Sequence, residues 1–217
     1  VPPQIRLKQE LNLRNALRED EFLLEFKEMM SKNKVYKSFI GLGYYDTLTP
    51  TVILRNILEN PAWYTAYTPY QAEIAQGRLE MLFNFQTMVC DLTSMEIANA
   101  SLLDEATAAA EAMSMFYGNR KGVKKKANIF LVAKNVNPQT LDVVLGRAKP
   151  KGIEVVHGEI SEVELQREDV FGVLFQNPGA QGEIKDYSKE VSIAQENGIQ
   201  TVIATDLLAS ALIKPAG

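Results

Sequence analysis

Short apolar runs alternate with segments of helical spacing from residue 128 to residue 217. Strands that read as continuous apolar runs are typical of a parallel sheet buried on both faces, with helices as the crossovers. The pattern therefore predicts an α/β fold with three layers and a mainly parallel sheet. Because the sequence stops soon after the fourth run, we expect an incomplete sheet and a fragment of a longer protein. The predicted strands cover 129–133, 153–156, 171–175 and 201–204, and the predicted helices cover 138–148 and 187–196.

Before residue 128 the chain reads mainly as helices and loops. Asp20 is a residue type that caps helix N-termini, and Thr49 followed by Pro50 fits an N-cap and a first helical position. Two longer helices are predicted over 73–92 and over 104–118. We therefore divide the chain into residues 1–70, an N-terminal arm with helices and aromatic loops, and residues 71–217, a partial α/β domain.

The composition excludes several kinds of site. The chain has one Cys and one His, so it lacks the four Cys or His ligands of a structural zinc site, and we expect no metal. Cys90 has no partner for an internal disulfide and lies in a predicted helix, where we interpret it as a core residue. His157 has no nucleophile beside it in the sequence and is interpreted as structural or exposed.

The formal net charge is −4, with 23 basic and 27 acidic residues, which argues against a nucleic-acid partner. The basic run over residues 120–126 has no interleaved aromatic residues and is interpreted as a solvated surface loop. No apolar run approaches the roughly 18 residues of a membrane-spanning helix, so no membrane partner is expected. Glycine-rich nucleotide fingerprints are absent.

Two helix starts are candidate ligand sites. The turn around Ala106 and Thr107 offers free N–H groups to an anion such as a phosphate, but Asp104 and Glu105 would repel it, and they fit equally well as caps. Asp206 follows a predicted parallel strand, where α/β folds bind ligands. Its carboxylate can hold a protonated ring nitrogen or a hydroxyl, or it can cap the next helix.

Aromatic residues gather in two loops. Tyr44 and Tyr45 follow two glycines in a shaped loop at 41–47, and a second aromatic connector runs from residue 63 to residue 71. Tyrosine hydroxyls on such loops can line a substrate pocket or a partner interface, and the same rings can simply be half-buried at the base of a loop.

Long ordered strings of this sequence resemble one protein family. They include GLGYYDT at 41–47, ILRNILEN at 53–60, YTPYQAE at 67–73, FQTMVCD at 85–91, ANASLLDE at 98–105, GVLFQ at 172–176 and ATDLLA at 204–209. The strings cover nearly the whole chain and resemble the amino-terminal half of glycine decarboxylases, the P-proteins of the glycine cleavage system.

The resemblance implies a pyridoxal-phosphate enzyme of fold-type I, a glycine dehydrogenase that decarboxylates glycine. Such an enzyme passes the aminomethyl group to the lipoyl arm of the H-protein, and the cofactor supplies the electron sink. The family has two homologous halves, fused or split into subunits, and only the carboxyl-terminal half carries the cofactor lysine. The resemblance therefore implies no cofactor lysine here, with pyridoxal phosphate held by the lysine-bearing half or β-type subunit, and a dimer or higher assembly. It also implies a bacterial cytoplasmic parent, with a mitochondrial one as the alternative.

The resemblance also assigns residues to roles. Ala106, Thr107, Asn137 and Asp206 occupy vestigial positions of the cofactor cup, with Asn137 where the catalytic half has a ring-stacking His. The residues expected to line the glycine or lipoyl pocket are Tyr44, Tyr45, Thr47, Tyr67 and Gln71.

Two alternatives remain open. In one, the chain is a non-catalytic scaffold that pairs with the lysine-bearing half. In the other, it is an unrelated α/β module for a small phosphorylated ligand, against which the acidic turn at Asp104 and Glu105 argues.

Overall fold

The computed structural model describes residues 1–9, 11–64, 71 and 73–217. The chain forms two compact units, Val1–Phe39 and Ile40–Gly217. The division expected at residue 70 lies among residues outside the described ranges and stays a prediction.

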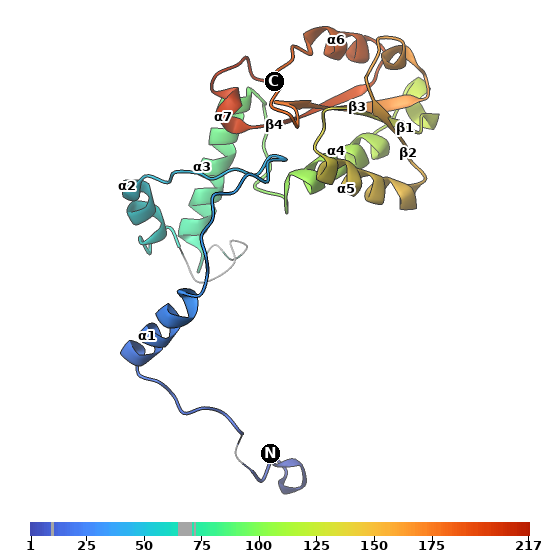
Figure 1. Ribbon diagram of the computed structural model, residues 1–217. Helices are drawn as coiled ribbons and strands as arrows, with labels where there is room; N and C mark the ends of the chain where they lie inside the picture. Colours follow the sequence, from blue (N-terminus) through green and yellow to red (C-terminus); the bar gives the residue numbers. More distant parts are fainter. Residues whose placement is uncertain (10, 65–70, 72) are drawn as a thin grey trace. The chain divides into compact units, whose positions relative to one another are not determined.

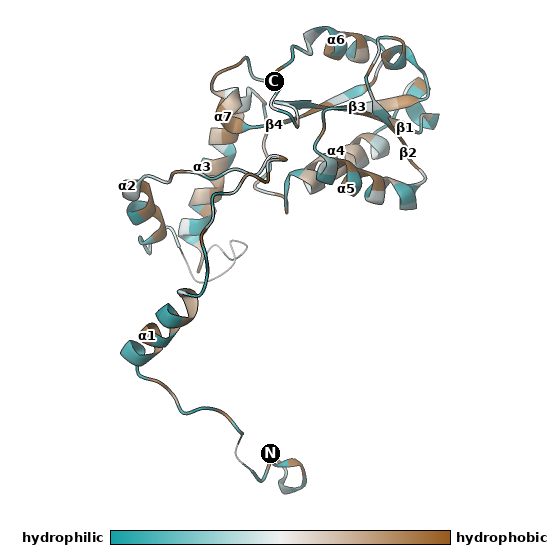
Figure 2. Cartoon of the chain, viewed as in Figure 1, coloured by the Kyte–Doolittle hydropathy of each residue, from teal (hydrophilic) through white to brown (hydrophobic). Residues whose placement is uncertain are grey.

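The unit Val1–Phe39 contains one α-helix, α1 (Glu19–Met30). The prediction that Asp20 caps this helix is wrong, because Arg18 is the N-cap residue and Asp20 lies in the first turn. Glu21 accepts the Arg18 backbone N–H at 3.0 Å, and acidic side chains in a first turn stabilise the positive end of a helix. Both hydrophilic and hydrophobic residues lie on α1 (Figure 2), and its apolar side chains, such as Phe22 and Phe26, are exposed.

The unit Ile40–Gly217 contains a four-stranded parallel sheet of order β2-β1-β3-β4. The four apolar runs therefore form the predicted strands. The run at 129–133 matches its strand at both ends, and the structure moves the ends of the other three by one or two residues. Pairing with neighbours on both sides lets β3 extend over eight residues. The strands are β1 (Ile129–Ala133), β2 (Glu154–Gly158), β3 (Val170–Asn177) and β4 (Gln200–Thr205).

Helices cover both faces of this sheet (Figure 1). The helices α4 (Glu105–Gly118) and α5 (Pro138–Ala148) lie on one face, and α6 (Ser188–Glu196) lies on the other. From the central strands β1 and β3, the β1-α5-β2 and β3-α6-β4 connections run toward opposite edges of the sheet. They also pass over opposite faces, so the two crossovers have the same hand, as expected of right-handed βαβ units. The predicted three-layer α/β architecture is confirmed.

The core lies between the sheet and its helices. Phe130 of β1 and Phe171 of β3 are fully buried, with ring centroids 5.6 Å apart. Ala109 and Ala110 of α4 are buried too, and these small side chains let α4 pack closely on the sheet.

The helices predicted to start at residues 50 and 73 begin one and three residues later. Pro50 has an extended ψ of 135° and is the N-cap residue, so α2 (Thr51–Ile53) starts after it and continues as a π-helix over Leu54–Leu58. The helix α3 (Gln76–Thr93) contacts the short helix α7 (Leu207–Ser210). Cys90 of α3 is half-buried, so its interpretation as a core residue holds only in part.

The interpretation of 120–126 as a solvated loop is wrong for one residue. Residues Gly122–Lys126 form a 3₁₀-helix, and the Lys124 side chain is only 6% exposed. Its Nζ donates to the Arg167 carbonyl at 2.6 Å, which satisfies the buried ammonium, and burial lowers the Lys124 pKa. The apolar stem of a lysine can fill such a position because only its tip needs a polar partner.

Candidate functional site

A topological switch point lies between the neighbouring strands β1 and β3. The chain continues from β1 into α5 on one face of the sheet and from β3 into α6 on the other face. Open parallel sheets bind ligands at the carboxyl ends of such strands. A cavity of about 560 Å³ lies at this edge. Its wall is formed by the loop 41–45, by residues of the loop after β3, by residues 204–212, and by Glu105, Asn137 and Gln176.

Two hydrogen bonds hold the loop 41–45 against the rest of its unit. Gln139 Nε2 donates to the Leu42 carbonyl at 2.6 Å, and the Tyr45 hydroxyl donates to a carboxylate oxygen of Asp206. Gly43 has a φ of +87°, and a Cβ there would meet Asn137 Nδ2 at 3.0 Å. Both the backbone conformation and the close approach therefore favour glycine at this position.

Asn137 lies at the base of the cavity and is only 3% exposed. Its backbone N–H donates to Gln176 Oε1 at 2.9 Å, and its Nδ2 lies 3.4 Å from Glu105 Oε1. Its Oδ1 has no hydrogen-bond partner among the described residues. Native structures leave few buried polar atoms unpaired, so this acceptor calls for an explanation.

Asn135, which lies in the turn after β1, makes further polar contacts near Asn137. Asn135 Nδ2 donates to the Gln176 carbonyl at 3.1 Å and to the Tyr187 hydroxyl at 3.0 Å. Burial raises the pKa of Tyr187, so its hydroxyl stays neutral at ordinary pH. These hydrogen bonds connect the turn after β1 to β3 and to the residue before α6.

Asp206 has two roles in the cavity wall. Its Oδ1 accepts the backbone N–H groups of Leu208 at 2.7 Å and of Ala209 at 3.1 Å, which confirms it as the N-cap of α7. Its Oδ2 accepts the Tyr45 hydroxyl. Both carboxylate oxygens therefore already have partners within the protein.

Asp104 caps α4, as one of the two alternatives for this turn predicts. Its Oδ1 accepts the Thr107 N–H at 2.7 Å. Hydrogen bonding from the Thr107 side chain and, to a smaller extent, from its backbone N–H lowers the pKa of Asp104 below its usual 3.8. The N–H that a phosphate would need at this turn is therefore in use. Ala106 is buried, Thr107 is half-buried, and neither lines the cavity.

The cap makes the stability of α4 depend on pH. A carboxyl whose pKa is lower in the folded state stabilises the fold above its unfolded-state pKa, and the effect disappears as pH falls through the folded-state value. We expect Asp104→Asn to lower the melting temperature at pH 7, and to lose that difference progressively below about pH 4. Thermal unfolding followed by circular dichroism between pH 7 and pH 2.5 measures this, and a difference that is constant over this range would contradict the assignment.

The structure brings together four of the nine residues predicted for the site. Tyr44, Tyr45, Asn137 and Asp206 line the cavity. Four other predicted residues in described positions do not line this cavity: Thr47, Gln71, Ala106 and Thr107. Tyr67 lies outside the described residues.

Sequence reasoning missed the contributions of Gln139 and Gln176. Gln176 lies near the carboxyl end of β3, so the strand-end rule that singled out Asp206 would also have found it. The contact between Gln139 and Leu42 joins positions 97 residues apart, and nothing in the local sequence indicates it.

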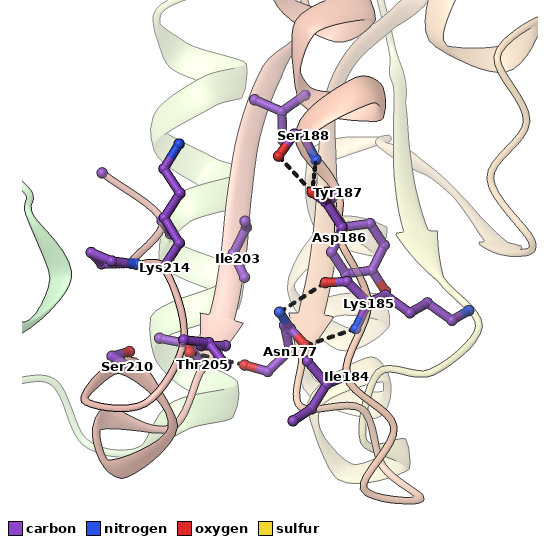
Figure 3. A pocket seen from close by; sticks show the side chains of 15 residues that line it. Asn177, Ile184, Lys185, Asp186, Tyr187, Ser188, Ile203, Thr205, Ser210 and Lys214 are labelled. Carbon is purple, nitrogen blue, oxygen red and sulfur yellow. Dashed lines mark hydrogen bonds between the residues drawn. The ribbon is translucent and has the colours of Figure 1, made fainter.

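A second cavity of about 480 Å³ lies beside β4 and α6 (Figure 3). Its polar groups largely pair with each other. Asn177 exchanges two hydrogen bonds with the Lys185 backbone at 3.0 and 3.2 Å, and Asp186 Oδ1 accepts the Ser188 N–H and hydroxyl. Several polar groups of this cavity therefore already have partners within the protein.

The cavity at the switch point does not fit pyridoxal phosphate. Two carboxylates, Glu105 and Asp206, line it, and none of its described lining residues is a Lys, Arg or His that would attract a phosphate or form a Schiff base. Asp206 already accepts three hydrogen bonds, so it is not free for a ring nitrogen.

Two further kinds of feature are absent from the described ranges. No group of three or more His, Cys, Asp or Glu residues there is arranged to hold a metal ion. In the same ranges, no helix has the length and apolar character needed to cross a membrane.

Comparisons with known proteins agree on one family. The family model of the glycine cleavage system P-protein matches residues 1–217. The glycine dehydrogenase (decarboxylating) of Vibrio campbellii is 55% identical over 217 residues, which are 100% of this chain and 22% of that protein. The mitochondrial glycine dehydrogenase (decarboxylating) A of Flaveria pringlei is 52% identical over 219 residues, covering all of this chain and 21% of that protein.

A solved structure is similar as well. The crystal structure of a glycine decarboxylase (P-protein) of the glycine cleavage system, in inhibitor-bound form, has a TM-score of 0.77 and 29% sequence identity. The match covers 99% of this chain and 49% of that one. The chain thus spans about a fifth of the length of the curated relatives named above.

Proposed function

This chain belongs to the glycine cleavage system P-protein family, and we propose that it is the amino-terminal part of a glycine dehydrogenase (decarboxylating). In this proposal the whole enzyme decarboxylates glycine with pyridoxal phosphate and passes the aminomethyl group to the lipoyl arm of the H-protein. The cofactor is held by the lysine-bearing carboxyl-terminal half or β-type subunit. The present chain serves assembly and the lining of the active site. The proposed location is the bacterial cytoplasm, with the mitochondrion as the alternative, and relatives of both kinds match.

One observation supports the proposal that another part of the enzyme holds the cofactor. The cavity at the switch point has no cation for the phosphate and no lysine for a Schiff base among its described lining residues. The family chemistry needs both. A chain that keeps the fold but lacks these groups supports an active site whose cofactor is held elsewhere.

Tyr44 and Tyr45 are proposed to line the glycine or lipoyl pocket of the whole enzyme, together with Thr47, Tyr67 and Gln71. The two tyrosines are 68% and 64% exposed, so their rings remain available to a further part of the protein. The loop that carries them is held by Gln139 and Asp206, which gives the exposed rings a defined position.

We expect Tyr45→Phe in the full-length enzyme to lower kcat/KM for glycine about tenfold, because loss of a hydrogen bond to a carboxylate releases the loop. Tyr44→Phe is expected to lower kcat/KM as well, because Tyr44 is proposed to line the same pocket. The measurement is glycine-dependent CO₂ release with lipoylated H-protein, with sedimentation as a control for assembly. Wild-type rates in both variants would overturn the proposed lining role.

The exposed apolar side chains of α1 favour a second candidate role, that of a non-catalytic scaffold. Phe22, Leu24 and Met29 are more than half exposed in the described structure, and such surfaces are typical of interfaces. In that role the chain pairs with the lysine-bearing half, and the tyrosine variants described above keep full activity and normal assembly.

A further inference from the structure

We propose that Gln139 is a positioning residue, which holds the turn at 41–44 in its conformation and so sets where Tyr44 and Tyr45 lie. The inference rests on the proposed function, because it concerns tyrosines that are proposed to line a pocket of the whole enzyme. It deepens that proposal by naming a residue outside the loop on which their position depends. Three features support it: the backbone conformation of the turn, its hydrogen bond to α5, and the anchoring of α5.

Residues 41–44 form a tight turn that suits Leu42 poorly. The Tyr44 N–H donates to the Gly41 carbonyl at 3.0 Å, and the φ angles of Leu42 and Gly43 are 57° and 87°. These angles match the two central positions of a type I′ turn, at which Asn-Gly is a preferred pair. Leucine is strained in this left-handed region because its Cβ crowds the following carbonyl oxygen. The turn therefore needs a contact that holds it.

Gln139 supplies this contact at the strained residue itself. Packing compensates the strain only in part, because Leu42 remains 44% exposed. Gln139 Nε2 donates to the Leu42 carbonyl at 2.6 Å, so the hydrogen bond stabilises the peptide group at the centre of the turn. Only the N–H side of the amide can make this bond, since two carbonyl oxygens both accept. Glutamine is therefore required as a donor, and a side chain of the same shape without the N–H would release the turn.

Gln139 is itself held in place by the sheet. It lies in the first turn of α5, two residues after the N-cap residue Asn137. The Asn137 backbone N–H donates to Gln176 Oε1 of β3 at 2.9 Å, and Val144 of the same helix is fully buried in the core. The start of α5 is thus fixed relative to β3, and a side chain on such a rigid element can position a loop.

The two tyrosines depend on the turn to different degrees. Tyr45 has a second hold, because its hydroxyl donates to Asp206. Tyr44 is 68% exposed, and its hydroxyl forms no hydrogen bond with the residues that the structure describes. The position of Tyr44 therefore follows from the turn that precedes it, and from the contact that Gln139 makes to that turn.

Hydrogen exchange in the full-length protein tests the inference without turnover. Gln139→Glu keeps the shape of the side chain and removes the N–H donor, so the turn should open more often. The Tyr44 amide is expected to exchange about three- to tenfold faster, the range for the loss of one hydrogen bond. Peptides that cover β3 should exchange as in the parent, which excludes general unfolding as the cause.

A rescue variant makes the result specific to the turn. Leu42→Asn, added to Gln139→Glu, places Asn-Gly at the two central positions, so the turn forms without the contact to Gln139. The double variant should slow Tyr44 exchange again. It should also restore kcat/KM for glycine, which Gln139→Glu alone is expected to lower by the same three- to tenfold.

Gln195→Glu is the matched control, because Gln195 is exposed in α6, does not line the cavity and gains the same charge. It should leave Tyr44 exchange as in the parent. Parent-like exchange in Gln139→Glu would overturn the inference, and so would a failure of Leu42→Asn to reverse the change; neither result bears on the lining role of the tyrosines. Full activity of the Tyr44→Phe and Tyr45→Phe enzymes would overturn that role without altering the exchange of the Tyr44 amide.

Discussion

Replacing Phe130 by Ala is expected to lower the free energy of unfolding by about 3–5 kcal/mol. Phe130 lies in β1, is 0% exposed, and stacks on Phe171 of β3. The same ring closes the space over Gly172, where an added Cβ would meet it at 3.0 Å. Removal of the ring therefore leaves a cavity at the centre of the sheet, where the neighbouring strands are held by pairing and cannot collapse into it.

Urea unfolding followed by circular dichroism measures this effect. Val123→Ala is the control, because Val123 is exposed in the 3₁₀-helix Gly122–Lys126 and its truncation should change the free energy of unfolding by less than about 0.5 kcal/mol. A Phe130→Ala cost as small as that of the control would show that the sheet does not form the core described here.

Gly77→Ala is expected to cost about 3 kcal/mol or more, because the new methyl group overlaps backbone atoms. A Cβ on Gly77 would lie 1.6 Å from the carbonyl oxygen of Ala62 and 2.7 Å from its carbonyl carbon. A flexible side chain could move away at little cost, but a backbone carbonyl can only move if the start of α3 separates from the segment around Ala62. The substitution therefore disrupts the packing of α3.

Gly146→Ala is the matched control for Gly77→Ala. Gly146 lies inside α5 with nothing within 4 Å of an added Cβ, so its variant should be stabilised by about 0.5–1 kcal/mol through helix propensity alone. Chemical unfolding of both variants separates the two effects. If both substitutions stabilise the protein, the close approach of α3 to Ala62 does not exist.

The sheet was largely predictable because its signal is local. The apolar run at 129–133 gives the whole of β1, and Pro138 marks the first residue of α5 as its fixed φ favours. The order of the strands was not predictable, because it depends on pairing between residues far apart in the sequence. The N-cap at Asp20 failed for a different reason: several acidic residues in a row all suit a first turn, so composition does not identify the boundary.

The site was predictable only in part. Asp104 and Asp206 cap their helices, which was one of the two alternatives for each residue. Capping could be predicted because it depends only on the next three residues. The hydrogen bond from Tyr45 to Asp206 joins residues 161 positions apart. Asn137 Oδ1 is buried without a hydrogen-bond partner among the described residues, which depends on how segments distant in the sequence pack around it. Both arise from tertiary structure. The burial of Lys124 escaped prediction for the same reason, since its carbonyl partner Arg167 lies 43 residues away.

We propose that this part of the protein does not hold pyridoxal phosphate covalently. The most direct measurement loads the full-length protein with pyridoxal phosphate, reduces it with borohydride, and locates the labelled lysines by mass spectrometry. We expect a stoichiometric label outside residues 1–217 and none within them. Stoichiometric labelling of one lysine within residues 1–217 would contradict it, because the chain would then carry a catalytic centre of its own.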